Sequence, residues 1–324
     1  MQTRVLGRSG ITVSALGMGC WAIGGPFWRG ETPVGWGDVN DEESRRSLER
    51  ALDLGVTFFD TADVYGCGHS ERIVGEVLAG LRNDVVIATK FGNVFDEQTK
   101  RITGFSAEPA FIRNACEASL RRLNTDYIDL YQFHKGDYDL DRADEVVETL
   151  ERLVEEGKIR AYGWSTDDPE RARAFARGEN CAAIQQRLNI FEGSEETLAL
   201  CEAENLASIN RGPLAMGLLT GKFNPESTLP ANDVRRDWDF RSGPQAKRLR
   251  MLEELREVLT AGGRTLAQGA LGWLWARSEV TVPIPGFKTV AQVEENAGAL
   301  AFDPLSDTQM ADIEELVSST NDAR

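Results

Sequence analysis

Two patterns of hydrophobic and polar positions alternate along the chain. Short, continuously apolar runs such as Val85-Val86-Ile87-Ala88 are typical of strands buried on both faces, and the segments between them have the apolar spacing of amphipathic helices. We predict eight strands, at residues 14–19, 56–60, 84–90, 127–133, 159–164, 181–186, 206–211 and 281–284. Helices are predicted at 41–53, 71–81, 106–123, 141–156, 168–177, 194–204 and from residue 289 onward, with two more flanking Gly262-Gly263.

Each predicted strand is followed by a helix, which indicates parallel strands joined by crossover helices. Eight such units in 324 residues favour a closed barrel over an open sheet. Alternation around Gly7 and Gly10 predicts a small β-hairpin at residues 4–13, ahead of the first barrel strand. The expected fold is therefore an α/β, eight-stranded parallel (β/α)8 TIM barrel that forms a single domain over residues 1–324, with extra helices near the seventh and eighth strands and at the C-terminus.

A dinucleotide-binding fingerprint, G-x-G-x-x-G/A, is matched literally by residues 17–22, with the acidic pair Asp41-Glu42 about 20 residues further on. That fingerprint requires a helix to begin at once, and Gly24-Gly25-Pro26 cannot supply one. We therefore favour the barrel, in which these glycines lie at the top of a strand where the backbone approaches a ligand.

The charge balance excludes some partners. There are 36 Lys and Arg against 52 Asp and Glu, so the formal net charge is −16, and no polybasic run offsets it. Neither nucleic acid nor an anionic membrane is expected as a partner. A bound phosphate would need local positive groups within this negative field.

The cysteines and the N-terminus indicate a compartment. Five dispersed cysteines, odd in number and without a close pair, fit a reducing setting. The N-terminal residues lack a signal-peptide pattern, and no apolar run approaches the roughly 20 residues that span a bilayer. We expect a cytoplasmic protein, and the pattern does not define its oligomeric state.

Chemistry-bearing residues stand at the ends of three consecutive predicted strands. The second ends in Asp60 with Tyr65 just beyond it, the third ends in Lys90, and the fourth ends in His134. Each has an ordinary alternative, such as a helix cap, loop packing or projection into water. Because strand C-termini share one face of a barrel, and the chain has only two histidines and five tyrosines, we predict that the four residues (the tetrad) form one site.

These four residue types suit proton donation to a developing alkoxide. A phenol has a pKa of about 10 and needs a nearby cation to stabilise its phenolate form, which Lys90 can provide. An ion pair with Asp60 keeps Lys90 charged in a partly dry barrel mouth. His134 can hydrogen-bond the substrate oxygen or assist the proton transfer. The electrons for such a reduction must come from a cofactor.

The other strand ends offer groups that suit a cofactor. Ser165-Thr166 and Gln185 have hydrogen-bonding side chains that suit a carboxamide. The glycine-studded loop 212–222 could wrap a pyrophosphate, with Lys222 as counter-charge. After the last strand, a capping-box pattern begins at Thr289, and a helix N-terminus there is the usual phosphate site of a barrel.

Six segments closely resemble the aldo-keto reductase family. Three carry the tetrad: FDTADVYGCGHSE, VIATKFG and DYIDLYQFH. The others are EEGKIRAYGWS, GPLAMGLLTGKF and VPIPGFKTVAQVEENAGAL, so the similarity runs from about residue 3 to residue 315. The resemblance implies a barrel that binds NAD(P)H without a Rossmann fold, with Asp60, Tyr65, Lys90 and His134 as catalytic residues and direct hydride transfer to a carbonyl carbon.

The family pattern also implies cofactor-binding positions. Those around the nicotinamide and its carboxamide are Gly19, Cys20, Trp21, Ser165, Thr166 and Gln185. Those near the pyrophosphate are Arg211, Gly212, Pro213, Leu214, Gly217 and Lys222. Those around the adenosine and its ribose phosphate are Gly286, Phe287, Lys288, Gln292 and Asn296.

Two positions depart from the family pattern. Thr166 stands where the family often has Asn, and Arg211 stands where an aromatic frequently stacks on the nicotinamide. Lys288 favours the 2′-phosphate of NADPH, although a lone lysine leaves NADH possible as the cofactor.

The expected reaction is NADP-dependent reduction of the aldehyde or ketone group of a small molecule, with Tyr65 as general acid. Trp21, Trp28 and Phe91 are predicted to contact the substrate, and no metal site is predicted. Arg29 and Lys135 leave room for an anionic group or a sugar. The resemblance leaves two alternatives open, a polyol or sugar dehydrogenase working in the oxidative direction and an NADPH-sensing regulatory subunit with little turnover.

Overall fold

Eight parallel strands form the barrel in this computed structural model, which describes residues 2–322. The order is β14-β13-β12-β11-β10-β7-β6-β3, and a parallel bridge between Gly19 and Gly286 joins the two ends of the sheet. The strands are β3 (Gly17–Gly19), β6 (Phe58–Asp60), β7 (Val86–Phe91), β10 (Ile128–Phe133), β11 (Ile159–Ser165), β12 (Cys181–Arg187), β13 (Ala207–Arg211) and β14 (Thr281–Pro283). The predicted (β/α)8 barrel is confirmed.

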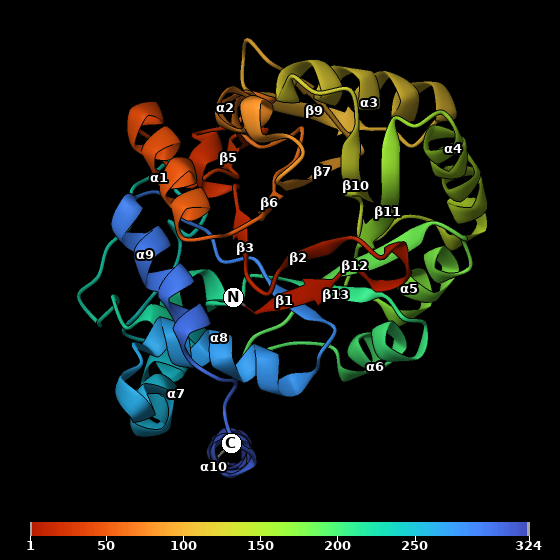
Figure 1. Cartoon of the computed structure of the whole chain (residues 1–324). Helices are drawn as coiled ribbons and strands as arrows, with labels where there is room; N and C mark the ends of the chain where they lie inside the picture. The colour runs from red at the N-terminus through yellow and green to blue at the C-terminus, as the bar shows by residue number, and fades with distance from the viewer. Residues whose placement is uncertain (1, 323–324) are drawn as a thin grey trace.

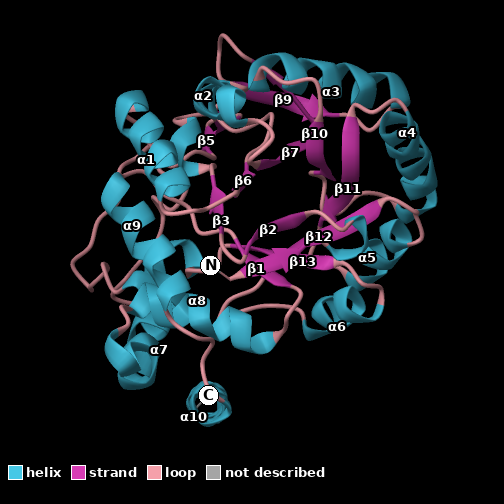
Figure 2. Ribbon diagram, in the orientation of Figure 1, coloured by secondary structure: helices cyan, strands magenta, loops and turns pink. Residues whose placement is uncertain are grey.

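Helices form an outer ring around these strands (Figures 1 and 2). They are α1 (Asp41–Asp53), α2 (His69–Leu78), α3 (Pro109–Leu123), α4 (Ala143–Glu155), α5 (Pro169–Ala176), α6 (Glu195–Ala203), α8 (Leu266–Arg277) and α9 (Val290–Gly298). Several begin at a polar cap. The side chains of Asn40, Asp168, Ser194 and Thr289 each accept a backbone N–H of the first turn, which satisfies donors that a helix N-terminus leaves unpaired.

The extra elements expected outside the ring are present. They are α7 (Gly243–Thr260), α10 (Asp307–Asp322) and the N-terminal hairpin of β1 (Thr3–Val5) and β2 (Thr12–Ser14). Leu6, Ile11 and Val13 of the hairpin pack with the residues inside the barrel. At Gly7, which has φ 49°, a Cβ atom would lie 2.5 Å from the carbonyl oxygen of Ala182. Only glycine therefore allows the hairpin to close this end of the barrel.

A second, small sheet was not predicted. It contains β5 (Thr32–Pro33), β4 (Trp28–Arg29), β9 (Arg101–Phe105) and β8 (Asn93–Asp96), in that order. Its strands are two to five residues long and lack a clear apolar alternation, so the sequence carries little signal for them. Phe95 and Ile102 of this sheet pack against the loop that carries Tyr65, which places the sheet beside the expected site.

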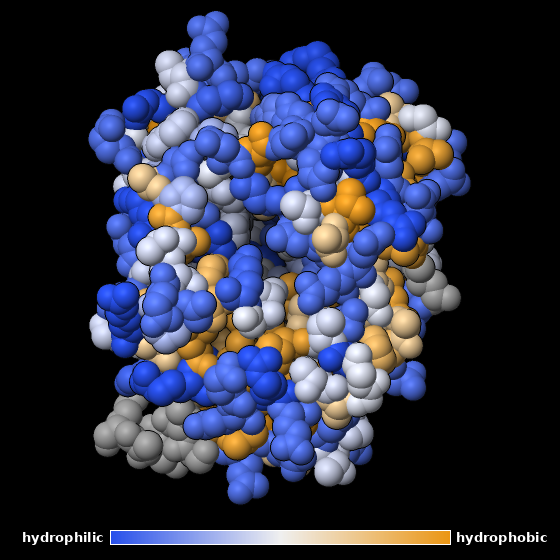
Figure 3. Space-filling view, turned by 90° about the vertical axis from the view of Figure 1, so that its left-hand side faces the viewer, coloured by the Kyte–Doolittle hydropathy of each residue, from blue (hydrophilic) through white to orange (hydrophobic). Residues whose placement is uncertain are grey.

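The core consists of two main layers. Phe58, Val86, Ala88 and Leu130 are among the residues that fill the barrel interior, while a larger cluster lies between the strands and the helices. The face of the molecule seen in Figure 3 is mostly hydrophilic, with scattered hydrophobic patches. Among the helices of residues 2–322, none is both long and apolar enough to cross a membrane.

Candidate active site

Lys90 lies at the centre of the cluster of polar side chains that β6, β7 and β10 bring together. Its Nζ donates to Asp60 Oδ1 at 2.5 Å and to the Thr61 carbonyl oxygen at 2.8 Å, and it is 3.3 Å from Tyr65 Oη. Lys90 and Asp60 are 0% and 2% exposed, and Tyr65 is 9% exposed. The predicted contact of Asp60 with Lys90 is confirmed, and the phenol lies on the same ammonium group.

The surroundings set the protonation states of this group. Burial alone would lower the pKa of Lys90, but the charges of Asp60 and Tyr65 and their hydrogen bonds reverse this effect and raise it. Lys90 is therefore a cation at neutral pH. Burial raises the pKa of Tyr65, and Lys90 opposes that rise. The phenol is thus protonated and able to donate, with a cation beside it to stabilise the phenolate.

Asp60 Oδ2 accepts two side-chain amide hydrogen bonds. Gln132 Nε2 donates at 2.9 Å and Gln185 Nε2 at 2.8 Å, so both oxygens of the carboxylate are satisfied inside the barrel. Gln132 was missed in the sequence, although it stands two residues before His134 and strand alternation places both on the same face. Gln185 was expected at a carboxamide, and its N–H groups are here engaged by Asp60 and by Gln132 Oε1 at 3.1 Å.

His134 follows β10 and faces Tyr65. The two rings meet edge to face at 84°, with centroids 5.9 Å apart. The imidazole is partly exposed, while its Nδ1 atom is buried and has no hydrogen-bond partner among the described residues. Enclosure first, and then the cations Lys90, Arg211 and Arg29, hold the pKa of His134 well below its usual 6.5. The imidazole is therefore neutral and offers one N–H donor.

Aromatic side chains form one wall beside the phenol. Trp21 stacks on Tyr65 with centroids 5.9 Å apart and an angle of 21°, and it meets Trp36 edge-on at 5.3 Å. Trp21 Nε1 donates to the carbonyl oxygen of Val34 at 3.1 Å, which fixes the indole. Trp28 lies in β4 and is partly exposed.

Phe91 does not belong to this wall, contrary to the prediction. It is fully buried and stacks on Tyr131 at 4.6 Å and Phe133 at 5.3 Å, in the layer between strands and helices. Because successive side chains of a strand point to opposite faces, an inward Lys90 requires an outward Phe91. This alternation was available in the sequence.

The predicted residues of β3 and β14 meet where the barrel closes. A Cβ atom on Gly19 would lie 2.7 Å from the carbonyl oxygen of Ile284, so this glycine permits close strand packing. Cys20 is fully buried, and its thiol donates to the Met18 carbonyl oxygen at 3.6 Å. Phe287 is also a core residue, at 1% exposure. Of these positions, Gly286 alone is exposed.

The ends of β11 and β12 hold the polar side chains expected at a carboxamide. Ser165 is 6% exposed and Thr166 is 1% exposed. Thr166 Oγ1 donates to the carbonyl oxygen of Gly136 at 3.0 Å, so this departure from the family pattern serves a loop contact. Ser165 and Gln185 stand side by side, because they are paired in register between β11 and β12.

The loop after β13 has an unusual backbone. Gly212 and Gly217 have φ of 62° and 94°, and the non-glycine residues Ala215 and Met216 have φ of 47° and 55°. Left-handed conformations of non-glycine residues are strained and concentrate at ligand sites. Of the remaining predicted positions here, Pro213 and Leu214 are buried and Lys222 is exposed.

Arg211, at the end of β13, pairs with an acid. Its Nη2 lies 2.5 Å from Asp167 Oδ2, and burial lowers its pKa while Asp167 opposes that shift. The positive charge of the guanidinium nevertheless acts to lower the pKa of both His134 and Tyr65, because Arg211 lies close to the tetrad.

Lys288 contacts a distant loop. Its Nζ donates to the carbonyl oxygens of Trp36 at 3.0 Å and Asp38 at 2.6 Å, while Gln292 Oε1 accepts its backbone N–H at 2.7 Å. Asn296 Nδ2 donates to the Gly286 carbonyl oxygen at 3.4 Å. Lys288 and Gln292 lie at the start of α9, where the capping pattern predicted a helix N-terminus, and Asn296 lies near the end of that helix.

Arg235 was not predicted, and the structure places it in the same region. Its guanidinium lies 4.3 Å from the ring centroid of Trp36, pairs with Asp233 at 2.7 Å and donates to the Met216 carbonyl oxygen at 3.0 Å. Although the Lys222 residue is exposed as a whole, partial desolvation of its ammonium group, and next Arg235, lowers its pKa, with a smaller effect of Lys288. Three cations therefore gather near the strained loop, and they suit a phosphate-bearing ligand.

The tetrad lies at the C-terminal ends of the strands of an eight-stranded parallel barrel, where (β/α)8 barrel enzymes have their active sites. Within residues 2–322, no group of three or more His, Cys, Asp and Glu side chains is arranged to hold a metal ion.

Comparisons with known proteins define the family. The aldo/keto reductase family model matches residues 15–318, and the chain belongs to this family. It is 32% identical to the aldo-keto reductase yakc [NADP(+)] of Schizosaccharomyces pombe, over 97% of this chain and 90% of that protein.

Two solved structures have the same fold. The glycerol dehydrogenase AKR11B4 from Gluconobacter oxydans has a TM-score of 0.84 at 32% identity, over 98% of this chain and 95% of that one. An aldo/keto reductase from Klebsiella pneumoniae, solved in complex with NADP and acetate, has a TM-score of 0.72 at 30% identity, over 98% and 96%.

Proposed function

We propose that this protein reduces aldehyde or ketone groups of small molecules to alcohols with NADPH. The observation that carries this proposal is the buried Lys90, which contacts both Asp60 and Tyr65 Oη. A buried ammonium fixed against a phenol is suited to general acid catalysis by that phenol. The Asp60 carboxylate keeps the lysine protonated in a site where burial alone would favour its neutral form.

Each tetrad residue has a defined role in this mechanism. The Tyr65 O–H donates its proton to the oxygen of the reacting carbonyl, and Lys90 stabilises the phenolate that remains. The neutral imidazole of His134 donates its N–H to the same oxygen and orients it. NADPH, when bound, would supply the hydride that reduces the carbonyl carbon. Trp21, stacked on Tyr65, limits the access of water to the phenol.

The residues around the barrel mouth fit NADPH. Ser165 and Gln185 have hydrogen-bonding side chains that suit the carboxamide, and Lys222, Arg235 and Lys288 are local cations in a chain of net charge −16. Lys288 at the start of α9 favours the 2′-phosphate. The yakc reductase of Schizosaccharomyces pombe is named for NADP(+), and the Klebsiella pneumoniae structure contains NADP, which supports the same choice for this chain.

The opposite direction is the second candidate. One neighbour of high structural similarity is a glycerol dehydrogenase, and a tyrosine that donates a proton in reduction accepts one in oxidation. Oxidation of a polyol would therefore use the same residues. Measuring both directions with glycerol, simple polyols and a panel of aldehydes decides between them.

Substitution of Tyr65→Phe tests the proposal, because it removes the proton donor and keeps the ring that stacks on Trp21. NADPH binding, followed by fluorescence titration, should be unchanged, while carbonyl reduction falls by about 100-fold or more. Tyr127→Phe is a matched control, because Tyr127 Oη donates one hydrogen bond, to the Arg82 carbonyl oxygen at 3.4 Å, and lies outside the tetrad. Retention of most turnover in Tyr65→Phe contradicts the assigned role. Binding of NADPH without repeated turnover on any carbonyl or polyol would favour the regulatory alternative.

A further inference from the structure

Gln132 of β10 is a buried amide inside the barrel, next to the tetrad. It is 0% exposed and pairs in register with Lys90 of β7 on one side and with Gly163 of β11 on the other. Side chains paired in register on neighbouring parallel strands point to the same face of the sheet, so Gln132 lies beside Lys90. Gly163 has no side chain, and a Cβ atom there would lie 2.3 Å from the Ala183 carbonyl oxygen. The interior next to Gln132 is therefore open toward β12.

Gln185 of β12 reaches across this space and completes a triangle of hydrogen bonds with Gln132 and Asp60. Gln132 Nε2 donates to Asp60 Oδ2 at 2.9 Å, and Gln185 Nε2 donates to the same oxygen at 2.8 Å. Gln185 Nε2 also donates to Gln132 Oε1, at 3.1 Å. All three side chains belong to residues that are at most 2% exposed, so the triangle is formed away from water.

The ionised Asp60 fixes the direction in which both amides face. A carboxylate is an acceptor only, whereas a glutamine amide has a donor side and an acceptor side. Lys90 holds Asp60 Oδ1 at 2.5 Å, and both glutamines must turn their NH2 groups toward Oδ2. Turning Gln132 over would set its oxygen against the carboxylate and would remove the acceptor of the second Gln185 N–H. Each member of the triangle therefore holds the other two in one orientation.

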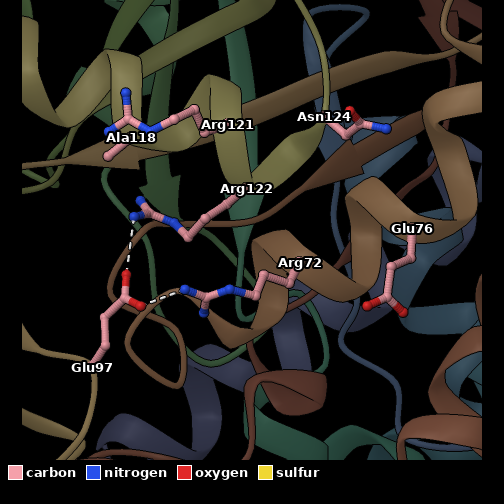
Figure 4. Close-up of a pocket in the computed structure, with 7 residues that line it drawn as sticks. All are labelled: Arg72, Glu76, Glu97, Ala118, Arg121, Arg122 and Asn124. Carbon is pink, nitrogen blue, oxygen red and sulfur yellow. Dashed lines mark hydrogen bonds and ion pairs between the residues drawn. The ribbon is translucent and has the colours of Figure 1, made fainter.

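The outer face of β7 carries a separate polar network. The Thr89 hydroxyl points outward and donates to Glu71 of α2 at 2.6 Å, and Arg122 Nε donates to the same carboxylate at 2.6 Å. Figure 4 shows the surface end of this network, where Arg122 meets Glu97 beside a hollow of about 630 Å³. These groups lie on the far side of β7 from the tetrad. They support the strand itself, and the interior triangle is the network that orients Asp60.

The orientation of the Gln185 amide decides what this side chain can offer to a ligand. Its Nε2 is engaged by Asp60 and Gln132, so the group left for a ligand is the oxygen Oε1, which is an acceptor. Ser165, paired with Gln185 in register, is the other residue expected at the nicotinamide carboxamide. An acceptor oxygen at Gln185 matches the NH2 group of a carboxamide and repels a carboxylate in the same place.

We propose that Gln132 is a positioning residue that links the proton-donating half of the site to the cofactor half. It braces Asp60, which pairs with Lys90, and it fixes Gln185 so that an acceptor oxygen receives the NH2 group of the nicotinamide carboxamide. Gln132 acts through these two partners. The proposal rests on the proposed reductase function, because that function places a nicotinamide at Gln185.

The variant Gln132→Met tests the amide against simple packing. It keeps an unbranched side chain of similar size and removes both the donor and the acceptor. NADP+ should bind about tenfold more weakly, because Gln185 loses one of its two fixed partners. Gln186→Met is the matched control, since Gln186 is equally buried in β12 and its amide donates to Ser208 Oγ at 2.9 Å. Gln186 points to the outer face of the barrel, so its substitution should leave NADP+ affinity unchanged.

The variant Gln132→Glu makes the same contacts conditional on a proton. A protonated carboxyl group donates its O–H to Asp60 and accepts from Gln185, as the amide does, whereas an ionised one can only accept. Burial and the charge of Asp60 raise the pKa of the introduced group above its ordinary value of about 4.3, and Lys90 opposes that rise. β11 and β12 present the uncharged Gly163 and Gln185 to this position.

The expected result is an affinity for NADP+ that depends on pH in Gln132→Glu. Expressed relative to the wild type at the same pH, which cancels titration of the cofactor phosphate, affinity should be near normal at low pH. It should fall by about tenfold or more as pH rises and the introduced carboxyl group ionises. Tryptophan fluorescence measures this affinity without turnover, once urea unfolding has shown that each variant is folded. An affinity ratio that stays constant with pH, or a Gln132→Met variant that binds NADP+ as the wild type does, overturns the proposal.

The wild type provides a test that needs no substitution. The nicotinic acid analogue of NADP+ has a carboxylate in place of the carboxamide, and it should bind about tenfold more weakly or worse than NADP+, because its oxygens face Gln185 Oε1. Equal affinity for the two would show that Gln185 does not present its oxygen, and the proposal would be wrong. If the wild type reduces no carbonyl but shows this discrimination, and Gln132→Glu shows the pH dependence, the proposed function fails while the role of Gln132 stands.

Discussion

Replacing Lys90 with methionine should separate the effect of the buried ion pair on stability from its effect on catalysis. The substitution keeps an unbranched side chain that is one atom shorter, and it removes the ammonium group that contacts Asp60, Thr61 and Tyr65. The Asp60 carboxylate would then remain buried with only the amide N–H groups of Gln132 and Gln185. Breaking a buried pair by removing one partner costs about 3–5 kcal/mol. Because two donors remain on Asp60, we expect a loss near the lower end, about 3 kcal/mol.

The double variant Asp60→Asn with Lys90→Met provides the matched control. It removes both charges, and the asparagine carbonyl still accepts the hydrogen bonds of the two glutamines. We expect it to recover most of the lost stability, to within about 1 kcal/mol of the wild type. Turnover should not recover, because the phenol of Tyr65 has no cation in either variant.

Urea unfolding, followed by circular dichroism and tryptophan fluorescence, measures the free energy of unfolding when the two transitions coincide. Reduction of an aldehyde at saturating NADPH measures kcat for the same preparations. A Lys90→Met variant as stable as the wild type would refute the reasoning about the buried pair. Recovery of turnover in the double variant would refute the role of the lysine charge in catalysis.

Three further outcomes are expected. His134 stays neutral in the folded protein but takes up a proton on unfolding below pH 6.5. The wild type should therefore lose about 1.4 kcal/mol of stability per pH unit below that value relative to His134→Gln. The same pH dependence of the free energy of unfolding in both proteins, measured with urea, would contradict this. Burial, and next the charge of Glu71, raises the pKa of Asp63 in the folded protein, so its effect on stability has the opposite pH dependence. The free energy of unfolding of the wild type, relative to that of Asp63→Asn, should fall as pH rises above about 4, and a constant difference between pH 4 and 7 would refute this. Lys288→Ala should weaken NADPH binding more than NADH binding in fluorescence titrations, by about tenfold for a lost charged contact, and an equal effect on both cofactors would remove the assignment to the 2′-phosphate.

The barrel could be predicted because each strand leaves a local signature. Strands buried on both faces are continuously apolar, as in Val85 to Ala88, and the helices between them begin at polar caps such as Asn40 and Ser194. The tetrad could be predicted because all strand C-termini of a parallel barrel share one face. Asp60, Lys90 and His134 were therefore assigned to one site from their positions at strand ends.

Other features depend on contacts that the local sequence does not encode. Arg235 stacks on Trp36, and Lys288 binds the carbonyl oxygens of Trp36 and Asp38. These segments are about 200 or more residues apart, and nothing in either one specifies the other. The small sheet of β4, β5, β8 and β9 is likewise formed by pairing between two loops. By contrast, the outward direction of Phe91 and the inward direction of Gln132 follow from strand alternation, so both could have been predicted from the sequence.

A single-turnover experiment tests the central claim most directly. NADPH bound to excess enzyme is mixed with an aldehyde in a stopped-flow instrument, and the loss of its absorbance gives the rate of hydride transfer for the wild type, Tyr65→Phe and the control Tyr127→Phe. The account predicts complete NADPH oxidation in the wild type and the control, and a rate about 100-fold or more lower in Tyr65→Phe despite unchanged NADPH binding. A Tyr65→Phe rate close to that of the wild type would contradict the account.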